Sequence, residues 1–194
     1  MLPLLEAAEK SSYRAAALAK QLLQFSRGGS PVKKSIQVDE MVQESVALFL
    51  TGTTIISNID CQPHQTILAD EQQIRQAFNN IILNAVHAMP EGGTLTVRVN
   101  GVKLFVGNRH SLPAGDYVEM EFTDSGCGIQ RENLHKIFDP YFTTKNKGAG
   151  LGLSTTCAVI SKHGGCIGIT SETGISTTVT ILLPSFEEKS AGSV

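Results

Sequence analysis

The chain has 194 residues and a net charge of −2, with 41% hydrophobic and 18% charged residues, which is an ordinary globular composition. No apolar run reaches the roughly 18–20 residues that a membrane-spanning helix needs, and no signal-like segment opens the chain. The four cysteines are far apart without a C-x-x-C pair. This spacing argues against a disulfide framework or a zinc site and predicts reduced thiols in the cytoplasm.

The charges are unevenly distributed along the chain. Residues 1–34 contain six Lys or Arg against two Glu, a net +4, so the remaining residues carry −6. The basic residues are scattered around a predicted helix, which favours a solvated face over membrane or nucleic-acid binding. No aromatic cluster is available to stack on bases, so we expect no nucleic-acid partner.

The first predicted element is a helix over residues 3–27, ended by Gly28-Gly29. Its apolar positions repeat with the 4-3 spacing of a heptad seam, made of Leu4, Ala8, Ser11, Ala15, Leu18, Leu22 and Phe25. A lone helix of this length cannot bury such a seam. Packing on the same chain would cover it, but the length and the glycine break favour a helix from a hairpin or a dimeric bundle.

Beyond residue 31 the pattern becomes a mixture of helices and strands. The predicted elements are, in chain order, a helix at 39–50 with Asp39 as N-cap, strands at 55–61 and 66–69, a helix at 70–89, strands at 94–100 and 117–123, a helix at 151–163, strands at 167–171 and 177–183, and a frayed polar tail from 185. Regular βαβ alternation is absent from this order. It predicts an α+β fold, a two-layer α/β sandwich whose mixed sheet is covered by helices on one face.

Two amides lie on the long helix at Asn80 and Asn84, four residues apart and therefore on one face. Amides on an otherwise apolar helix are costly unless they are satisfied. Their oxygens suit Mg²⁺, which keeps several waters and takes further ligands from phosphates. Caps or hydrogen bonds between helices explain the pair equally well.

A second pattern follows the strand at 117–123, where Asp124 is followed by Gly126 and Gly128. A carboxylate at a strand end can accept a hydrogen bond from an exocyclic amine such as that of adenine, and glycine allows a ligand to approach closely. A simple Asp-Gly turn is the alternative.

A third pattern is the glycine run Gly148, Gly150 and Gly152, which leads into a predicted helix whose N-terminal amides could bind phosphate. Lys145 and Lys147 precede it and could supply charge. The run lacks the Gly-Lys-Ser/Thr ending of a Walker loop and the G-x-G-x-x-G spacing of a dinucleotide fingerprint.

Taken in order, Asn-x3-Asn, Asp-x-Gly-x-Gly, the stretch FDPYFTTK at 138–145 and Gly-x-Gly-x-Gly resemble the N, G1, F and G2 boxes of the histidine kinase catalytic domain. That domain belongs to the ATPase superfamily shared with gyrase, the mismatch-repair protein MutL and a heat-shock chaperone. NNIILNAVHAMPEGGTLTV together with FDPYFTTK resembles the nitrogen-regulation type of sensor kinase. The resemblance implies a partial dimerisation hairpin helix at 1–30, an ATP-binding domain at 31–185 and a tail at 186–194.

The resemblance also implies the residues of the site. Asn84 would bind Mg²⁺ with Asn80 beside it, Asp124 would accept from adenine, and residues 138–147 would form a lid with Lys145 near the phosphates. The nucleotide-binding set is Asn80, Asn84, Asp124, Gly126, Gly128, Ile129, Phe138, Thr144, Lys145, Gly148, Gly150, Leu151, Gly152, Leu153 and Thr177, of which Asn80, Asn84 and Lys145 would be catalytic.

Three departures from the family pattern stand out. His87 occupies a position where many kinases have a phosphate-contacting Lys, and we interpret it as a helix-surface residue. The last motif, usually Gly-x-Gly-Thr, has Ser176 before Thr177. None of the five histidines is followed by an acidic residue as the phosphoacceptor usually is; His163, beside Gly164-Gly165, suits a helix C-terminus favoured by the dipole.

The resemblance therefore predicts the ATP-binding part of a sensor histidine kinase that lacks its phosphoacceptor helix. ATP or ADP, Mg²⁺, a response regulator receiver domain and a second copy joined through the hairpin helices are the expected partners. The expected location is the cytoplasm, with any membrane anchor lying upstream in the full-length protein. A relative that hydrolyses ATP, a protein-serine or mitochondrial-type kinase, and a docking module without nucleotide chemistry are the alternatives. Hydrolysis is disfavoured because Asn80 stands where those enzymes place a Glu base.

Overall fold

The computed structural model describes residues 32–145 and 149–187. The chain divides into two compact units, Met1–Pro31 and Val32–Val194, and the fold below is that of the second. The predicted N-terminal helix and its heptad seam lie outside the described residues, as do Lys147 and Gly148.

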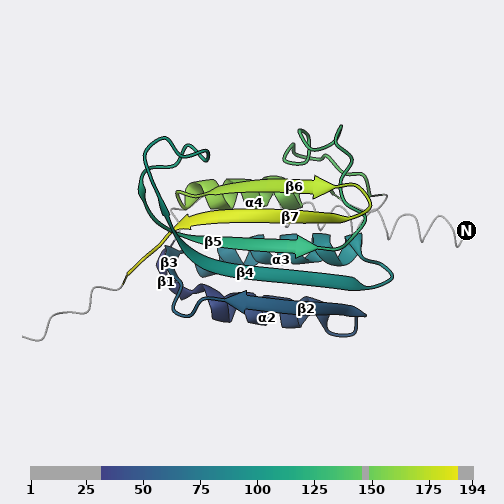
Figure 1. The fold of residues 1–194 in the computed structure, drawn as a ribbon, viewed down its shortest axis with the longest axis horizontal. Helices are drawn as coiled ribbons and strands as arrows, with labels where there is room; N and C mark the ends of the chain where they lie inside the picture. Colours follow the sequence, from purple (N-terminus) through teal and green to yellow (C-terminus); the bar gives the residue numbers. More distant parts are fainter. Residues whose placement is uncertain (1–31, 146–148, 188–194) are drawn as a thin grey trace, which may run out of the picture. The chain divides into compact units, whose positions relative to one another are not determined.

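Ten elements make up the described fold. In chain order they are β1 (Lys34–Gln37), α2 (Val38–Leu50), β2 (Ile55–Cys61), β3 (Thr66–Ala69), α3 (Glu71–Ala88), β4 (Gly93–Leu104), β5 (Gly115–Asp124), α4 (Gly152–Lys162), β6 (Cys166–Glu172) and β7 (Ser176–Pro184). Five strands form one sheet in the order β2-β4-β5-β7-β6, and β1 and β3 form a small second sheet. Figure 1 shows the three helices together on one face of the large sheet. The predicted α+β sandwich is confirmed.

The large sheet is mixed because β2 runs parallel to β4, whereas the other pairs are antiparallel. Strands β4 and β5 alternate buried and less buried residues, as expected where one face meets helices and the other meets water. Phe78 on α3 packs against Phe122 on β5 with ring centroids 5.5 Å apart. This contact fixes the central helix over the strand that ends at Asp124.

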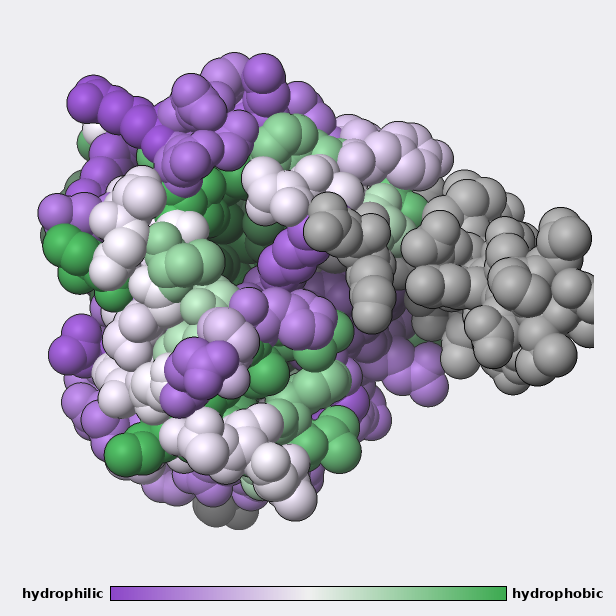
Figure 2. Space-filling view, turned by 90° about the vertical axis from the view of Figure 1, so that its right-hand side faces the viewer, coloured by the Kyte–Doolittle hydropathy of each residue, from purple (hydrophilic) through white to green (hydrophobic). Residues whose placement is uncertain are grey.

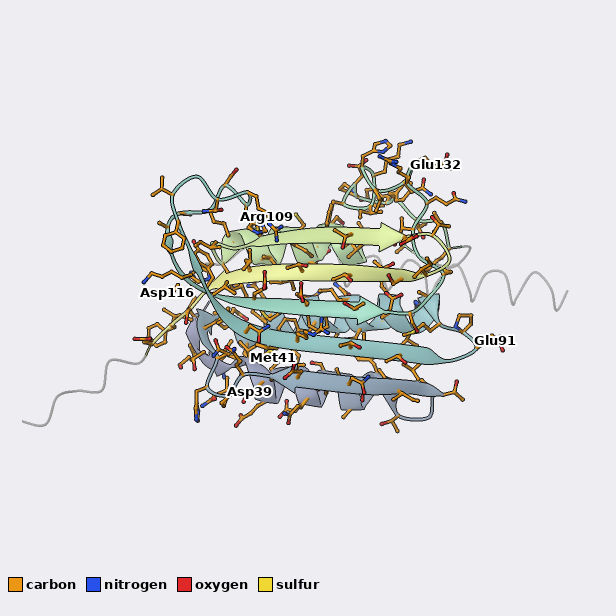
Figure 3. The ribbon with its side chains drawn as sticks, viewed as in Figure 1. Asp39, Met41, Glu91, Arg109, Asp116 and Glu132 are labelled. Atoms are coloured by element: carbon orange, nitrogen blue, oxygen red, sulfur yellow. The ribbon has the colours of Figure 1, made fainter. Side chains whose placement is uncertain are left out.

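The long helix α3 begins and ends close to the predicted positions. Asp70 is its N-cap and accepts a hydrogen bond from the backbone N–H of Gln73, while Met89 is its C-cap. The predicted N-cap of α2 is wrong. Gln37 holds that position, and Asp39 lies in the first turn beside the buried Met41, as Figure 3 shows.

The polar tail begins later than predicted. The backbone N–H of Ser185 donates to the Asp116 carbonyl, and that of Phe186 donates to the Thr66 carbonyl. These two residues therefore join the large sheet to β3, and the prediction that the chain frays from residue 185 is wrong.

His163 is the C-cap of α4, which confirms its predicted place at a helix C-terminus, and its ring makes two hydrogen bonds. Its side chain is 4% exposed, its Nδ1 lies 2.8 Å from the Val159 carbonyl, and its Nε2 accepts the N–H of Asp70 at 3.1 Å. Because Nε2 accepts, Nδ1 is the ring nitrogen that donates to the Val159 carbonyl. It fastens the end of α4 to the start of α3.

Candidate functional site

The site is built around Asp124, the last residue of β5. The residue is 6% exposed, and its Oδ1 accepts the backbone N–H of Gly126 at 3.0 Å. Burial raises the pKa of Asp124, and the Gly126 N–H, the Lys145 charge and the Thr177 backbone N–H oppose that rise. A buried carboxylate with unfilled acceptor capacity is suited to recognising a hydrogen-bond donor.

The two glycines after Asp124 are required by the protein's own packing. A Cβ at Gly126 would lie 2.6 Å from the Ala88 carbonyl oxygen, at the end of α3. Gly128 has φ +66°, and its Cβ would lie 2.2 Å from the Glu172 carbonyl oxygen. Packing against α3 and the β6–β7 turn therefore requires glycine at both positions, and the close approach of a ligand stays a prediction.

The two amides of α3 have different partners. Asn80 Nδ2 donates to the Gly152 carbonyl at 3.1 Å and to Thr156 Oγ1 at 3.4 Å, so it joins α3 to the start of α4. Asn84 Oδ1 accepts a hydrogen bond from Lys145 Nζ at 3.1 Å. Hydrogen bonds between helices therefore account for Asn80, whereas Asn84 contacts the ammonium of Lys145.

Lys145 reaches back from the loop after residue 138 to α3. Its Nζ lies 3.5 Å from His87 Nδ1, as well as 3.1 Å from Asn84. Lys145 is exposed as a residue, but desolvation of its ammonium lowers its pKa. Electrostatic interactions with Cys127 and Asp124 oppose this shift. Desolvation, and then the Lys145 charge, lower the pKa of His87. His87 is exposed, as predicted, and also borders the lid lysine.

A backbone hydrogen bond joins the predicted lid to the glycine run that follows it. Tyr141 N–H donates to the Gly150 carbonyl at 2.9 Å, and both residues have positive φ. Phe138 is half-buried and Thr144 is exposed. The lid leads into α4, where Leu151 is the N-cap and Gly152 and Leu153 open the first turn, and no side chain caps that end. Among the described residues, the first amides of α4 therefore have no side-chain partner.

Sequence reasoning missed Ser171 of β6. Its Oγ accepts the N–H of Ile129 at 2.8 Å, which fixes the loop that follows Asp124. The signal was present, because Ile167, Ile169 and Ser171 alternate along a strand and place a hydroxyl where an apolar residue is expected.

These segments meet at one end of the sheet. Asp124 and Lys145 interact electrostatically, Lys145 contacts α3, and Thr177 pairs with Asp124 across β5 and β7. Figure 2 faces this end and shows a hollow with hydrophobic walls and a hydrophilic rim. In Figure 3, Glu91 and Glu132 lie at this end, and Asp116 lies at the other.

Within 32–145 and 149–187, no group of three or more His, Cys, Asp or Glu could hold a metal ion. In the same ranges no helix is long and apolar enough to cross a membrane.

The fold defines a two-layer α/β sandwich in which α3, β5, β7 and the start of α4 meet at one end of the sheet. The chain belongs to the family described as histidine kinase-, DNA gyrase B-, and HSP90-like ATPase, whose model matches residues 69–187.

The most similar relatives include two sensor kinases. The chain is 38% identical over 192 residues to the sensor kinase CckA of Brucella abortus, covering 94% of this chain and 20% of that protein. It is 32% identical over 170 residues to the signal transduction histidine-protein kinase AtoS of Escherichia coli, covering 85% and 26%. The chain thus spans about a fifth to a quarter of the length of these relatives.

Solved structures agree with the fold. The catalytic domain of histidine kinase ThkA matches with a TM-score of 0.65 at 25% identity, covering 78% of this chain and 95% of that chain. Full-length ShkA, solved in complex with AMPPNP, matches with a TM-score of 0.73 at 22% identity, covering 92% and 37%, which bears on the fold alone.

Proposed function

We propose that this chain is the ATP-binding catalytic part of a sensor histidine kinase, which transfers the γ-phosphate of ATP to a histidine on a dimerisation helix. The observation that carries the proposal is the convergence of three separate segments. Asn84 on α3 accepts from Lys145 of the lid, and Lys145 interacts in turn with the charge of the buried Asp124. These groups match the three parts of a nucleotide complex: base, phosphates and cation.

Asp124 is assigned to the adenine base. Its buried carboxylate would accept the exocyclic amine, and Gly126 N–H and Thr177 N–H hold it in place. Gly128 and Ile129 follow in the loop that the β6–β7 turn supports. The half-buried Phe138 would cover the base from the lid side.

Asn84, Lys145 and the start of α4 are assigned to the phosphates. Asn84 Oδ1 already accepts from an ammonium, so it fits a magnesium ion that shares the phosphate oxygens. Mg²⁺ would neutralise charge on the phosphates, which is most of what phosphoryl transfer requires besides positioning. The uncapped first turn of α4 offers backbone N–H groups to the same oxygens.

Hydrolysis of ATP is the second candidate, and two contacts argue against it. Asn80 stands where the hydrolases place their base, and its amide nitrogen donates to Gly152 and Thr156. Glu71, the acid at the start of α3, forms ion pairs with Lys34 and Arg75, and their hydrogen bonds lower its pKa. Neither side chain is placed to take a proton from water.

The wider role follows from the same proposal. The phosphohistidine would pass its phosphoryl group to a receiver domain of a response regulator, and the seam on residues 3–27 would pair with the partner helix of a homodimer. The proposed location is the cytoplasm.

Nucleotide binding is tested with two Asp variants on the same strand. Isothermal titration calorimetry would measure Mg-ADP binding to the wild type, Asp124→Asn and Asp116→Asn. Asp116 is the second residue of β5, at the opposite end of the sheet, and its Oδ1 lies 3.8 Å from Lys103 Nζ in an exposed pair. We expect Asp124→Asn to abolish binding and Asp116→Asn to preserve it. Equal affinity in all three proteins would refute the assignment of Asp124.

Phosphotransfer is tested in a protein that joins this chain to a dimerisation helix carrying a phosphoacceptor histidine. The protein would be incubated with γ-labelled Mg-ATP, and the label on protein tested for chemical stability. Label that is lost in acid and kept in base indicates phosphohistidine. Free phosphate without labelled protein would favour hydrolysis instead.

A further inference from the structure

The β6–β7 hairpin holds the loop that follows Asp124 through three hydrogen bonds. Gly174 N–H donates to the Cys127 carbonyl at 2.8 Å, Thr173 Oγ1 donates to the Ile129 carbonyl at 3.1 Å, and Ile129 N–H donates to Ser171 Oγ at 2.8 Å. Ser171 is half-buried and lies between this loop and β7. It thus contacts both segments assigned to the base.

The hydroxyl of Ser171 has a defined proton direction. It donates to the Ser176 carbonyl at 2.7 Å, and its oxygen lies 3.0 Å from Thr177 Oγ1. A hydroxyl has a single proton, so Thr177 must be the donor in the second contact. The hydroxyl proton of Thr177 is therefore committed to Ser171, and its oxygen is left as an acceptor.

Thr177 is the residue directly opposite Asp124. The two are partners in the β5–β7 register, they are 7% and 6% exposed, and the Thr177 backbone N–H donates to the Asp124 carboxylate. Because the Thr177 hydroxyl donates to Ser171, the side chains of Asp124 and Thr177 offer a base only hydrogen-bond acceptors and no donor. A 6-amino group on a purine provides the matching donor, whereas a 6-oxo group would face two acceptors.

We propose that Ser171 is a positioning residue that sets the preference of this site for 6-amino over 6-oxo purine nucleotides. The inference rests on the proposed function, since it assumes that Asp124 receives the base. Ser171 touches no nucleotide atom in this scheme. It acts by fixing the Ile129 amide and the direction of the Thr177 proton.

The experiment compares Mg-ADP with Mg-IDP, which carries a 6-oxo group, by calorimetric titration of four proteins. These are the wild type, Ser171→Ala, Ser171→Thr and Thr170→Ala, the last a hydroxyl removal on the exposed face of the same strand. In Ser171→Ala the Thr177 hydroxyl is free to donate to a 6-oxo group. We expect ADP affinity to fall about tenfold and IDP affinity to hold, so the ADP:IDP preference falls about tenfold. Ser171→Thr should restore the preference, and Thr170→Ala should match the wild type.

The outcomes separate the inference from the proposed function. A wild type that binds neither nucleotide would overturn both. A wild type that prefers ADP, with an unchanged preference in Ser171→Ala, would overturn the inference alone. So would an equal loss for both nucleotides, because a purely structural role lowers both affinities together. If Ser171→Ala does not fold, Ser171→Cys keeps the volume with a weak acceptor and serves in its place.

Discussion

Gly128→Ala is the substitution that best tests how the loop after Asp124 is positioned. Gly128 has φ +66°, and a methyl group there would lie 2.2 Å from the Glu172 carbonyl oxygen and 2.9 Å from the Thr173 Cα. Both neighbours are backbone atoms, which cannot move aside as a flexible side chain could. The loop and the β6–β7 turn would have to separate.

The expected loss of unfolding free energy in Gly128→Ala has two contributions. A non-glycine residue in the left-handed region costs about 1–2 kcal/mol. Overpacking against a fixed neighbour adds about 1–3 kcal/mol. Gly52 supplies the control, because it has φ +81° with nothing within 4 Å of its Cβ position. Gly52→Ala should therefore lose about 1–2 kcal/mol of unfolding free energy, and Gly128→Ala about 2–5 kcal/mol.

Urea unfolding and Mg-ADP titration of both variants provide the assay. Separation of the loop from the turn would break the bonds from Ile129 N–H to Ser171 and from Gly174 N–H to Cys127, so ADP affinity should fall at least about tenfold. Gly52→Ala should bind ADP like the wild type. Equal stability losses in the two variants, or normal ADP affinity in Gly128→Ala, would refute the packing argument.

Three further predictions concern single side chains. Burial raises the pKa of Asp124, so the contribution of this residue to stability is present at low pH and is lost as the pH rises through that pKa. The unfolding free energy of Asp124→Asn in urea, relative to that of the wild type, should therefore increase with pH. A difference that stays constant with pH would contradict this. Lys145→Ala should weaken Mg-ADP binding about tenfold or more by calorimetry, whereas the exposed Lys136→Ala should not. Asn80→Ala should lose about 1–2 kcal/mol of unfolding free energy, and equal stability with Asn58→Ala, exposed on β2, would exclude a link between α3 and α4.

The elements that could be predicted are those whose signals are local. Helix α3 has an apolar face over 18 residues and a capping Asp70, so its pattern alone determines its type and ends. Strand β1 was missed because its four residues bury a single side chain, Ile36, and depend on pairing with β3. The cap of α2 was misplaced because an acidic residue fits the first helical turn as well as the N-cap.

The same distinction applies to the site. The motifs around Asn84, Asp124 and Lys145 are short and ordered in sequence, so their resemblance to a family could be read directly. The groups that hold them come from distant segments. Asn80 meets Gly152 across 72 residues, and Ile129 meets Ser171 across 42. No local rule pairs residues at such separations.

The contacts also divide the candidate site into a part that the sheet holds and a part that one exposed side chain holds. Asp124 is fixed by its neighbours on β5 and β7, and the β6–β7 hairpin supports the loop after it through backbone and hydroxyl groups. Lys145, in contrast, contacts α3 by the tip of one long exposed side chain. An exposed contact of this kind contributes little to stability and can exchange for phosphate oxygens without disturbing the core. Under the proposed function, the position for the base would therefore be formed during folding, whereas the position for the phosphates would be completed only when a nucleotide binds.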